Sequence, residues 1–262
     1  MRSRAIRAEV AGARRFAATV SYDGTAFAGS QRQPNARTVQ EELEEAARSL
    51  FGADVRVDLA GRTDAGVHAI GQVAAFTVAT RLDAVTVGKA LNAHLPEDVA
   101  VRDVREVPGG FDPRRQARRR WYRYTIDNAP VRMPLLRRTA WHVEGALDVT
   151  AMQLAADALK GRHDFRACSG PLEPWRSSVR TVERAGWARE GCLVMFDIEA
   201  DAFLPKMVRR IVGALVRVGQ GRDAAGAFVE RFEAAEVGGI GPTAPARGLC
   251  LQRVWYDEGY VV

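Results

Sequence analysis

Hydrophobic and polar residues follow two successive patterns along the chain, and each predicts elements in the order strand, helix, strand, strand, helix, strand. The first opens with a loosely alternating apolar run at 16–22, typical of a strand. Thr38 then stands three residues before Glu41 at the start of an amphipathic stretch, which predicts a helix with a capping box. This helix ends near 51, and the remaining elements are strands at 54–60, 71–78 and 98–107 and a helix from Asp83 to about 94.

The second pattern begins near residue 118 and has the same order with one extra helix. Four apolar residues, Phe203, Met207, Ile211 and Leu215, recur at every fourth position and predict a helix that ends near 218. The other predicted elements are a strand at 118–127, a helix at 149–160, a hairpin at 178–188 and 192–200, a short helix at 223–235 and a strand at 249–256. Because no close sequence repeat is visible, the duplication rests on the order of elements alone.

A break separates the two patterns at 108–113, where two prolines and two glycines lie within six residues. We therefore expect a basic N-terminal tail at 1–15, a first half at 16–108 and a second half at 114–262. The order of elements in each half is that of the split ferredoxin-like unit. The predicted fold is α+β, with two ferredoxin-like halves that form one mainly antiparallel sheet and a central active-site cleft lined by loops of both halves.

Composition narrows the class of protein. With 262 residues, of which 47% are hydrophobic, the chain can bury a substantial core. No apolar stretch of about 18 residues exists, which argues against a membrane span, and no apolar signal core follows the N-terminal arginines. Cys168, Cys192 and Cys250 form no close pair, and the four histidines are scattered. We expect a protein of the reducing cytoplasm without a structural or catalytic metal.

The net charge of +6 favours a polyanionic partner, because each phosphate that a cation neutralises releases counterions. Five arginines crowd into seven residues directly before Trp121 and Tyr122: Arg114, Arg115, Arg118, Arg119 and Arg120. Guanidinium groups bind phosphates while aromatic rings stack on bases, so this segment is a candidate nucleic-acid surface. Two alternatives stay open, namely a codon bias toward arginine and a strand whose charged face is merely solvated.

The main candidate for chemistry is Asp64, in the segment Gly-Arg-Thr-Asp-Ala-Gly-Val-His-Ala at 61–69. The segment follows an apolar run and places one acid between two glycines and near Arg62, the layout of a reactive carboxylate on a tight loop. An Asp between glycines is also typical of an Asx turn, in which the side chain only caps its own backbone. Asp58, six residues earlier, is expected to be solvated or to lie at a ladder edge.

The segment at 61–69 resembles, position for position, the active-site loop of the TruA family of tRNA pseudouridine synthases, and further matches continue along nearly the whole chain. They are Tyr22-Asp23-Gly24-Thr25, Gln31-Arg32-Gln33, Thr38-Val39-Gln40, Asn92 with Leu95-Pro96, Tyr122-Arg123-Tyr124, Phe203 with Met207-Val208-Arg209, Thr243-Ala244-Pro245 and Gly248-Leu249. The chain departs from the family pattern at Ser30, where the family usually has Trp, and at Cys168, where an aromatic residue usually follows His-Asp-Phe.

The resemblance implies the same architecture and a cofactor-free isomerase. Such an enzyme converts uridine to pseudouridine in the anticodon arm of tRNA, at positions 38, 39 and 40, and forms homodimers. The resemblance also implies that Asp64 is the catalytic carboxylate and that Arg209 pairs with it. Arg210 lies about 100° further around the predicted helix and is therefore expected to face solvent or to bind phosphate.

The resemblance assigns the substrate-binding roles as well. Tyr122 stacks on the flipped uracil and carries a hydroxyl near the proton that must leave C5. Arg62 fills the vacated stack or holds the adjacent phosphate, and Leu249 forms the floor of the pocket. We also place Arg120, from the basic run, among the substrate-binding residues.

Several alternatives remain open. Arg62 could instead pair with a nearby carboxylate, and Leu249 could be ordinary strand core. Asp64 could attack C1′ or remove a sugar proton to give a glycal. The rival function is a non-catalytic RNA-binding protein with tandem ferredoxin-like units, against which a carboxylate that faces a polyanion argues. A third, a glycosidase that excises the base, would release free uracil.

Overall fold

The computed structural model describes residues 12–173, 175 and 177–257, and within them ten strands form a single sheet. The strand order is β4-β1-β3-β10-β5-β9-β8-β7, with β2 paired to β3 and β6 paired to β5. The strands are β1 Ala13–Tyr22, β2 Val57–Leu59, β3 His68–Ala79, β4 Val99–Val107, β5 Arg119–Asp127, β6 Trp141–His142, β7 Gly161–Asp164, β8 Val179–Glu190, β9 Leu193–Ala200 and β10 Leu249–Trp255. The helices are α1 Val39–Phe51, α2 Ala84–His94, α3 Val149–Asp157, α4 Met207–Gly219 and α5 Ala225–Glu233.

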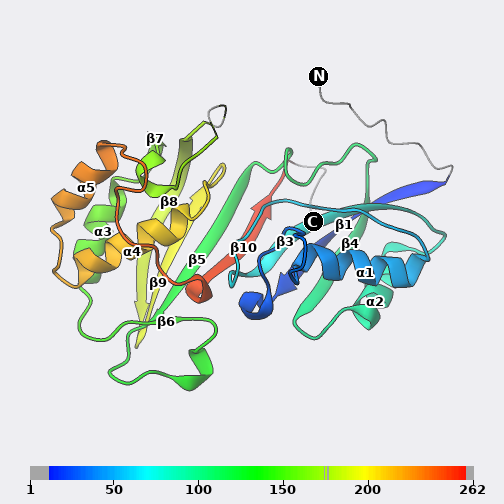
Figure 1. Cartoon of the computed structure of the whole chain (residues 1–262), viewed down its shortest axis with the longest axis horizontal. Helices are drawn as coiled ribbons and strands as arrows, with labels where there is room; N and C mark the ends of the chain where they lie inside the picture. Colours follow the sequence, from blue (N-terminus) through cyan, green and yellow to red (C-terminus); the bar gives the residue numbers. More distant parts are fainter. Residues whose placement is uncertain (1–11, 174, 176, 258–262) are drawn as a thin grey trace.

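Each half of the sheet has the strand order of a ferredoxin-like unit. In the first half β4, β1, β3 and β2 are neighbours in that order, and in the second β10, β5, β9 and β8 repeat it. Helices α1 and α2 accompany the first half, whereas α3, α4 and α5 gather on the second (Figure 1). The pairs along the sheet are antiparallel, with two parallel exceptions, β3–β10 and β5–β6. The predicted fold class is confirmed.

The two halves meet where the last strand of the chain enters the middle of the sheet. β10 lies between β3 and β5 (Figure 1). Its contact with β3 is short, with Cys250 opposite His68 and Leu251 opposite Ala69. Gly71 follows on β3, and a Cβ there would lie 2.1 Å from the carbonyl oxygen of Gln252. Glycine therefore permits the close approach of the two backbones at this seam.

Short polar side chains start the helices as the sequence predicts. The Thr38 hydroxyl accepts a hydrogen bond from the Glu41 amide, and the Asp83 carboxylate accepts one from the Thr86 amide. Each bond satisfies one of the amides that a helix leaves unpaired at its first turn. Gly52 ends α1 in the left-handed conformation, with φ of 66°, which glycine adopts without steric cost.

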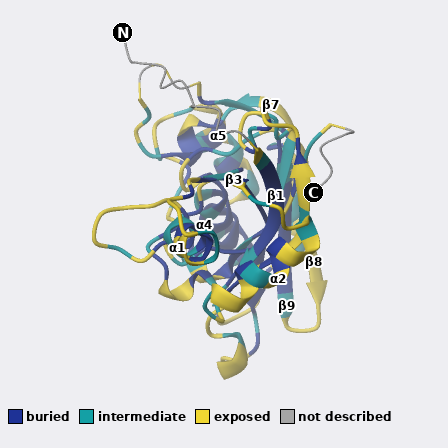
Figure 2. Cartoon of the chain, turned by 90° about the vertical axis from the view of Figure 1, so that its right-hand side faces the viewer, coloured by how far each residue is buried: buried dark blue, intermediate teal, exposed yellow. Residues whose placement is uncertain are grey.

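The core runs through both halves of the sheet. Buried residues concentrate on the strands and on the inner faces of the helices, whereas exposed residues lie on loops and outer helix faces (Figure 2). On α4, Ile211 and Leu215 are fully buried, as their spacing predicts.

The differences from the sequence prediction include two element boundaries and two short strands. α4 begins at Met207 and not near Phe203, because Pro205 and the left-handed Lys206, with φ of 61°, interrupt the backbone before it. β1 begins at Ala13, so the last three residues of the predicted tail are part of a strand, while residues 1–11 lie outside the described residues. β6 and β7 were not predicted, because strands of two and four residues are too short to show a period. The division into halves at 108–114 stays a prediction.

Candidate active site

A cavity of about 650 Å³ opens between the two halves, and all six predicted site residues line it. The first half contributes the loop after β2, and the second half contributes β5, the connection from β9 to α4 and the start of β10. The predicted residues among the lining are Arg62, Asp64, Arg120, Tyr122, Arg209 and Leu249. The fold thus brings together residues that lie up to nearly 190 positions apart in the chain.

The Asp64 loop is held at Thr63 by the segment that precedes α1. The Ser30 hydroxyl accepts a hydrogen bond from the Thr63 amide at 2.9 Å, and the Ser30 amide donates to the Thr63 carbonyl at 3.1 Å. The hydroxyl groups of Tyr22 and Thr63 are hydrogen bonded at 2.9 Å. Gly29 has φ of 110° and approaches the Thr63 carbonyl closely. Ser30 therefore fixes the residue next to Asp64, and its departure from the family pattern does not leave the loop unsupported.

The far end of the loop is held at His68. Its Nδ1 accepts a hydrogen bond from the Gly24 amide at 3.0 Å, and its Nε2 lies 2.8 Å from the Arg138 carbonyl oxygen. Asp23 Oδ1 also lies 3.2 Å from the same Nδ1. A Cβ on Gly24 would lie 2.0 Å from the Val67 carbonyl oxygen, so the opening turn and the loop are in close backbone contact. The loop is anchored at both ends, which leaves Asp64 in a defined place.

Asp64 faces Arg209 across the cavity. Arg209 Nη1 donates to Asp64 Oδ2 at 3.0 Å, and Arg209 Nε donates to the Ala244 carbonyl at 2.9 Å. The second bond fixes the guanidinium, so the first orients the carboxylate. The Asp64 side chain is 35% exposed and that of Arg209 only 16%, which leaves the carboxylate open toward the cavity. The predicted pairing of Arg209 with Asp64 is present, and the carboxylate binds an arginine from the other half of the molecule.

Tyr122 lies on the wall of the cavity. Its ring meets the ring of Phe203 edge to face, with 5.0 Å between the centroids. Burial raises the pKa of Tyr122 well above its ordinary value, while the positive charge of Arg120 opposes that rise. Tyr124, two residues on, is fully buried and donates to the Pro245 carbonyl at 2.8 Å, whereas Trp121 donates to Asp197. Tyr122 and Tyr124 share a face of β5, which Trp121 does not, and of the two tyrosines only Tyr122 is among the residues that line the cavity.

Leu249 is the first residue of β10, and it is buried and lines the cavity beside Tyr122. Gly248 precedes it, and a Cβ there would lie 2.5 Å from the Tyr124 ring. The glycine therefore lets the chain pass over Tyr124 and places Leu249 at the base of the cavity. Leu249 is both strand core and cavity lining, while its role as the floor of a uracil pocket stays a prediction.

Arg62 and Arg120 differ in their surroundings. Arg62 is exposed at the mouth of the cavity. Arg120 is half-buried and donates three hydrogen bonds to main-chain carbonyls: to Asp201 at 2.7 Å, to Ala60 at 3.1 Å and to Arg114 at 3.0 Å. Its burial lowers the pKa of Arg120 below the ordinary value of a guanidinium. These contacts join Arg120 to the walls of the cavity, whereas its role in substrate binding stays a prediction.

The arginine run before Trp121 is mostly paired with acids of the same chain. Arg118 is bound to Asp257, Arg119 to Glu183 and Glu199, and Arg115 lies 3.8 Å from Asp112. Long-range folding supplies Asp257, Glu183 and Glu199, which the local sequence does not show, yet the side chains of Arg115 and Arg118 stay 88% and 69% exposed, so the prediction that these two bind nucleic acid stays a prediction. Arg114 still lines the cavity.

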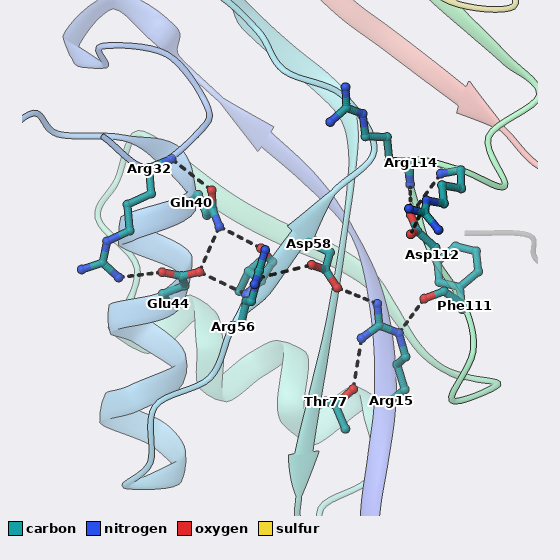
Figure 3. A network of polar contacts seen from close by, with 12 residues as sticks. Arg15, Arg32, Gln40, Glu44, Arg56, Asp58, Thr77, Phe111, Asp112 and Arg114 are labelled. Carbon is teal, nitrogen blue, oxygen red and sulfur yellow. Dashed lines mark hydrogen bonds and ion pairs between the residues drawn. The ribbon is translucent and has the colours of Figure 1, made fainter. Parts of the chain in front are cut away.

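The arginines near the N-terminus are also engaged within the chain. Arg14 is bound to Glu106, and Arg15, which is buried, donates to Asp58, Thr77 and the Phe111 carbonyl (Figure 3). Asp58 is therefore an ion-pair partner and lies outside the residues that line the cavity. Arg2, Arg4 and Arg7 lie outside the described residues.

Arg210 is half-buried and makes a hydrogen bond within the chain. Its Nη1 donates to the Gly238 carbonyl at 3.0 Å, so it ties α4 to the segment before β10. Cys168, the second departure from the family pattern, is fully buried in the core.

The cavity also contains residues that the sequence interpretation did not assign to the site. Phe203 matches the family pattern but was expected on a helix; it lies before the helix and packs on Tyr122. Lys206 and Arg180 line the cavity as well. Lys206 stands three residues before Arg209, a proximity that could have indicated it. Arg180 is on β8 and gave no local signal.

The described part of the chain contains no group of three or more His, Cys, Asp or Glu side chains that could hold a metal ion. None of its helices has the length and apolar character that crossing a membrane requires.

Comparison with known proteins gives the family. A family model described as tRNA pseudouridine synthase matches residues 18–114 and 155–257. The chain belongs to the tRNA pseudouridine synthase family. It is 44% identical over 238 residues to tRNA pseudouridine synthase A of Pelobacter propionicus, which covers 91% of this chain and 98% of that protein. It is 45% identical over 255 residues to tRNA pseudouridine synthase A of Chloroflexus aurantiacus, and the match covers 95% of this chain and 91% of that protein.

Family membership makes this chain an enzyme of tRNA modification, an isomerase that forms pseudouridine. A third relative, tRNA pseudouridine synthase A of Moorella thermoacetica, is 45% identical over 240 residues, with 91% of this chain and 98% of that protein covered. The resemblance drawn from the motifs is confirmed at the level of the family. The matched ranges include the Asp64 loop and α4, which carry the two members of the ion pair in the cavity, whereas β5 with Tyr122 lies between the two ranges.

Proposed function

We propose that the chain isomerises uridine to pseudouridine in the anticodon arm of tRNA, with Asp64 as the catalytic carboxylate. The observation that carries this proposal is the Asp64–Arg209 ion pair in a cavity shared with Tyr122 and Leu249. An RNA-binding protein without catalysis needs cations and rings, but a carboxylate held open in the cavity would repel its phosphates. The arrangement and the family together favour catalysis over the non-catalytic alternative.

The reaction breaks the bond from C1′ to N1, turns the uracil and joins C5 to the same sugar carbon. N1 gains a proton and C5 loses one, so nothing is oxidised and nothing leaves. Asp64, with Oδ2 bound to Arg209, can either attack C1′ or remove a sugar proton. Both routes fit a carboxylate that is oriented by one arginine and open on its other side.

The remaining lining residues suit the other demands of the reaction. A uridine must leave its stack to reach Asp64, which costs a few kcal/mol. We assign Arg62, exposed at the mouth, to the vacated stack or the adjacent phosphate. Tyr122 offers a ring to the uracil and a hydroxyl for the proton at C5, and Leu249 offers an apolar base to the pocket. The partly enclosed cavity limits the access of water, which would otherwise hydrolyse the intermediate.

The test is the release of tritium from C5 of uridine in tRNA, followed by mapping of pseudouridine by position. We expect release with wild-type protein and less than a tenth of it with Asp64→Asn, at unchanged tRNA binding. Asp64→Asn that keeps a tenth or more of the activity would contradict the catalytic role. Pseudouridine outside positions 38, 39 and 40 would contradict the anticodon-arm assignment, and free uracil would indicate a glycosidase.

We further propose that the protein acts in the cytoplasm as a homodimer whose tRNA contacts both subunits. One cavity must serve three neighbouring uridines, and a second subunit could hold the body of the tRNA while the arm bends. Light scattering at micromolar concentration should give twice the mass of the 28.7 kDa chain. A monomer with undiminished activity would exclude this arrangement.

A further inference from the structure

Arg120 occupies a junction in the cavity wall. It lies on β5 two residues before Tyr122, and since alternate residues of a strand share a face, both side chains point toward the cavity. Its neighbour Arg119 points to the opposite face, where it binds Glu183 and stacks on Trp255. Two adjacent arginines of one strand therefore have different surroundings, which makes Arg119 a control for Arg120.

The Arg120 guanidinium joins three separate segments. Nη1 donates to the carbonyl of Asp201, the first residue of the connection that carries Phe203 to α4. Nη2 donates to the carbonyl of Ala60, which opens the Asp64 loop, and to that of Arg114 in the linker between the halves. Each of these segments contributes lining residues to the cavity. One side chain thus sets the distance between the loop of Asp64 and the segment that leads to Arg209.

The chemistry of these contacts is that of a structural bridge. Three of the five donors of the guanidinium are directed at main-chain carbonyls in a fixed planar fork, a geometry that a lysine ammonium cannot reproduce. The linker is held independently at two other carbonyls, by Arg15 at Phe111 and by Tyr256 at Pro113. Loss of Arg120 would therefore release mainly the link between Ala60 and Asp201, while the linker stays in place.

We propose that Arg120 is a positioning residue for catalysis, which holds the Asp64 loop and the Phe203 segment at their working distance across the cavity, and not a phosphate-binding residue. The inference rests on the proposed function. A misplacement of about 1 Å can lower turnover by a factor on the order of 10² without loss of binding. A phosphate contact would have the opposite signature, since its loss weakens binding and reduces the salt dependence of the affinity.

The experiment compares Arg120→Lys with Arg119→Lys in the wild-type background. We measure turnover at saturating tRNA by tritium release, the Kd for tRNA at several salt concentrations, and the melting temperature. For Arg120→Lys we expect turnover to fall by about 10- to 100-fold, with Kd within about threefold of wild type and an unchanged salt slope. For Arg119→Lys we expect all three quantities to stay near those of wild type.

Chemical rescue is an independent test of the positioning role. In Arg120→Ala, guanidinium chloride at tens of millimolar should restore part of the turnover, because the free ion can occupy the three carbonyls. The same salt should not help Asp64→Asn. If Arg120→Ala does not fold, the test rests on Arg120→Lys. A positioning role then predicts a lower turnover of this variant with a Kd for tRNA close to that of wild type.

Other results would overturn the inference. A raised Kd with a shallower salt slope and full turnover would make Arg120 a phosphate contact. Turnover of Arg120→Lys equal to that of Arg119→Lys would remove any special role. Both outcomes leave the proposed function intact, whereas absence of tritium release by the wild-type protein would refute the proposed function itself.

Discussion

The close backbone contact between β3 and β10 at Gly71 gives a sharp test of how contact between the two halves affects stability and activity. Replacing Gly71 with alanine places a Cβ 2.1 Å from the Gln252 carbonyl oxygen, although real contacts of this kind are almost never under 3.0 Å. The obstacle is main chain, so the strands must separate by roughly 1 Å. Forcing extra volume into a packed site costs about 1–3 kcal/mol, and a backbone obstacle favours the upper end. For a chain of this size that corresponds to a loss of roughly 6–12 °C in melting temperature.

The same change should reduce activity, because Asp64 belongs to the first half while Tyr122 and Leu249 belong to the second. Thermal unfolding by circular dichroism and tritium release are the two assays. Gly186→Ala is the matched control, since Gly186 is also in a strand but its Cβ would lie 3.8 Å from a flexible glutamine side chain. We expect this control to be neutral or slightly stabilising. A melting temperature of Gly71→Ala within 1 °C of both wild type and control would refute the reasoning.

Three further predictions concern the site and the buried tyrosines. Tyr122→Phe keeps the ring but removes the hydroxyl, so turnover should fall by a factor on the order of 10² to 10⁴ at unchanged tRNA binding, and equal turnover would limit Tyr122 to stacking. Arg209→Ala removes the group that orients Asp64 and should lower turnover on the order of 10²-fold, with partial recovery in Arg209→Lys; a fully active alanine variant would show that the ion pair is dispensable. Burial raises the pKa of four tyrosines, that of Tyr22 to about 12. The folded state therefore keeps these phenols protonated while the unfolded state loses protons from about pH 10, so stability should fall as pH rises above 10, by at most about 1.4 kcal/mol per pH unit for each group. Urea unfolding at pH 9, 10 and 11 measures this, and an unchanged midpoint would contradict it. The four residues are Tyr22, Tyr122, Tyr124 and Tyr256.

The sequence predicted the order of the main elements and six of the residues that line the cavity. Helix caps such as Thr38 and Asp83 act over three residues, and amphipathic periods act over one or two turns, so both are visible in a short window. The Asp64 loop was recognisable for a similar reason, because its glycines and its acid are contiguous. The prediction of site residues in the second half came from the family resemblance, through matches at Tyr122, Arg209 and Leu249.

Only the tertiary structure decided which of these residues touch. Asp64 and Arg209 are 145 positions apart, and their contact depends on the insertion of β10 beside β3. The arginine run seemed basic in the sequence, but the folded sheet brings Glu183, Glu199 and Asp257 to it, and Arg120 is turned to carbonyls of three segments. The start of α4 likewise depends on Lys206, whose backbone is left-handed. The spacing of Phe203 and Met207 predicts a continuous helix and gives no sign of this interruption. Local periods and caps are short-range interactions and can be predicted along the chain, whereas the partner of a charge is fixed only when the sheet assembles and distant segments meet.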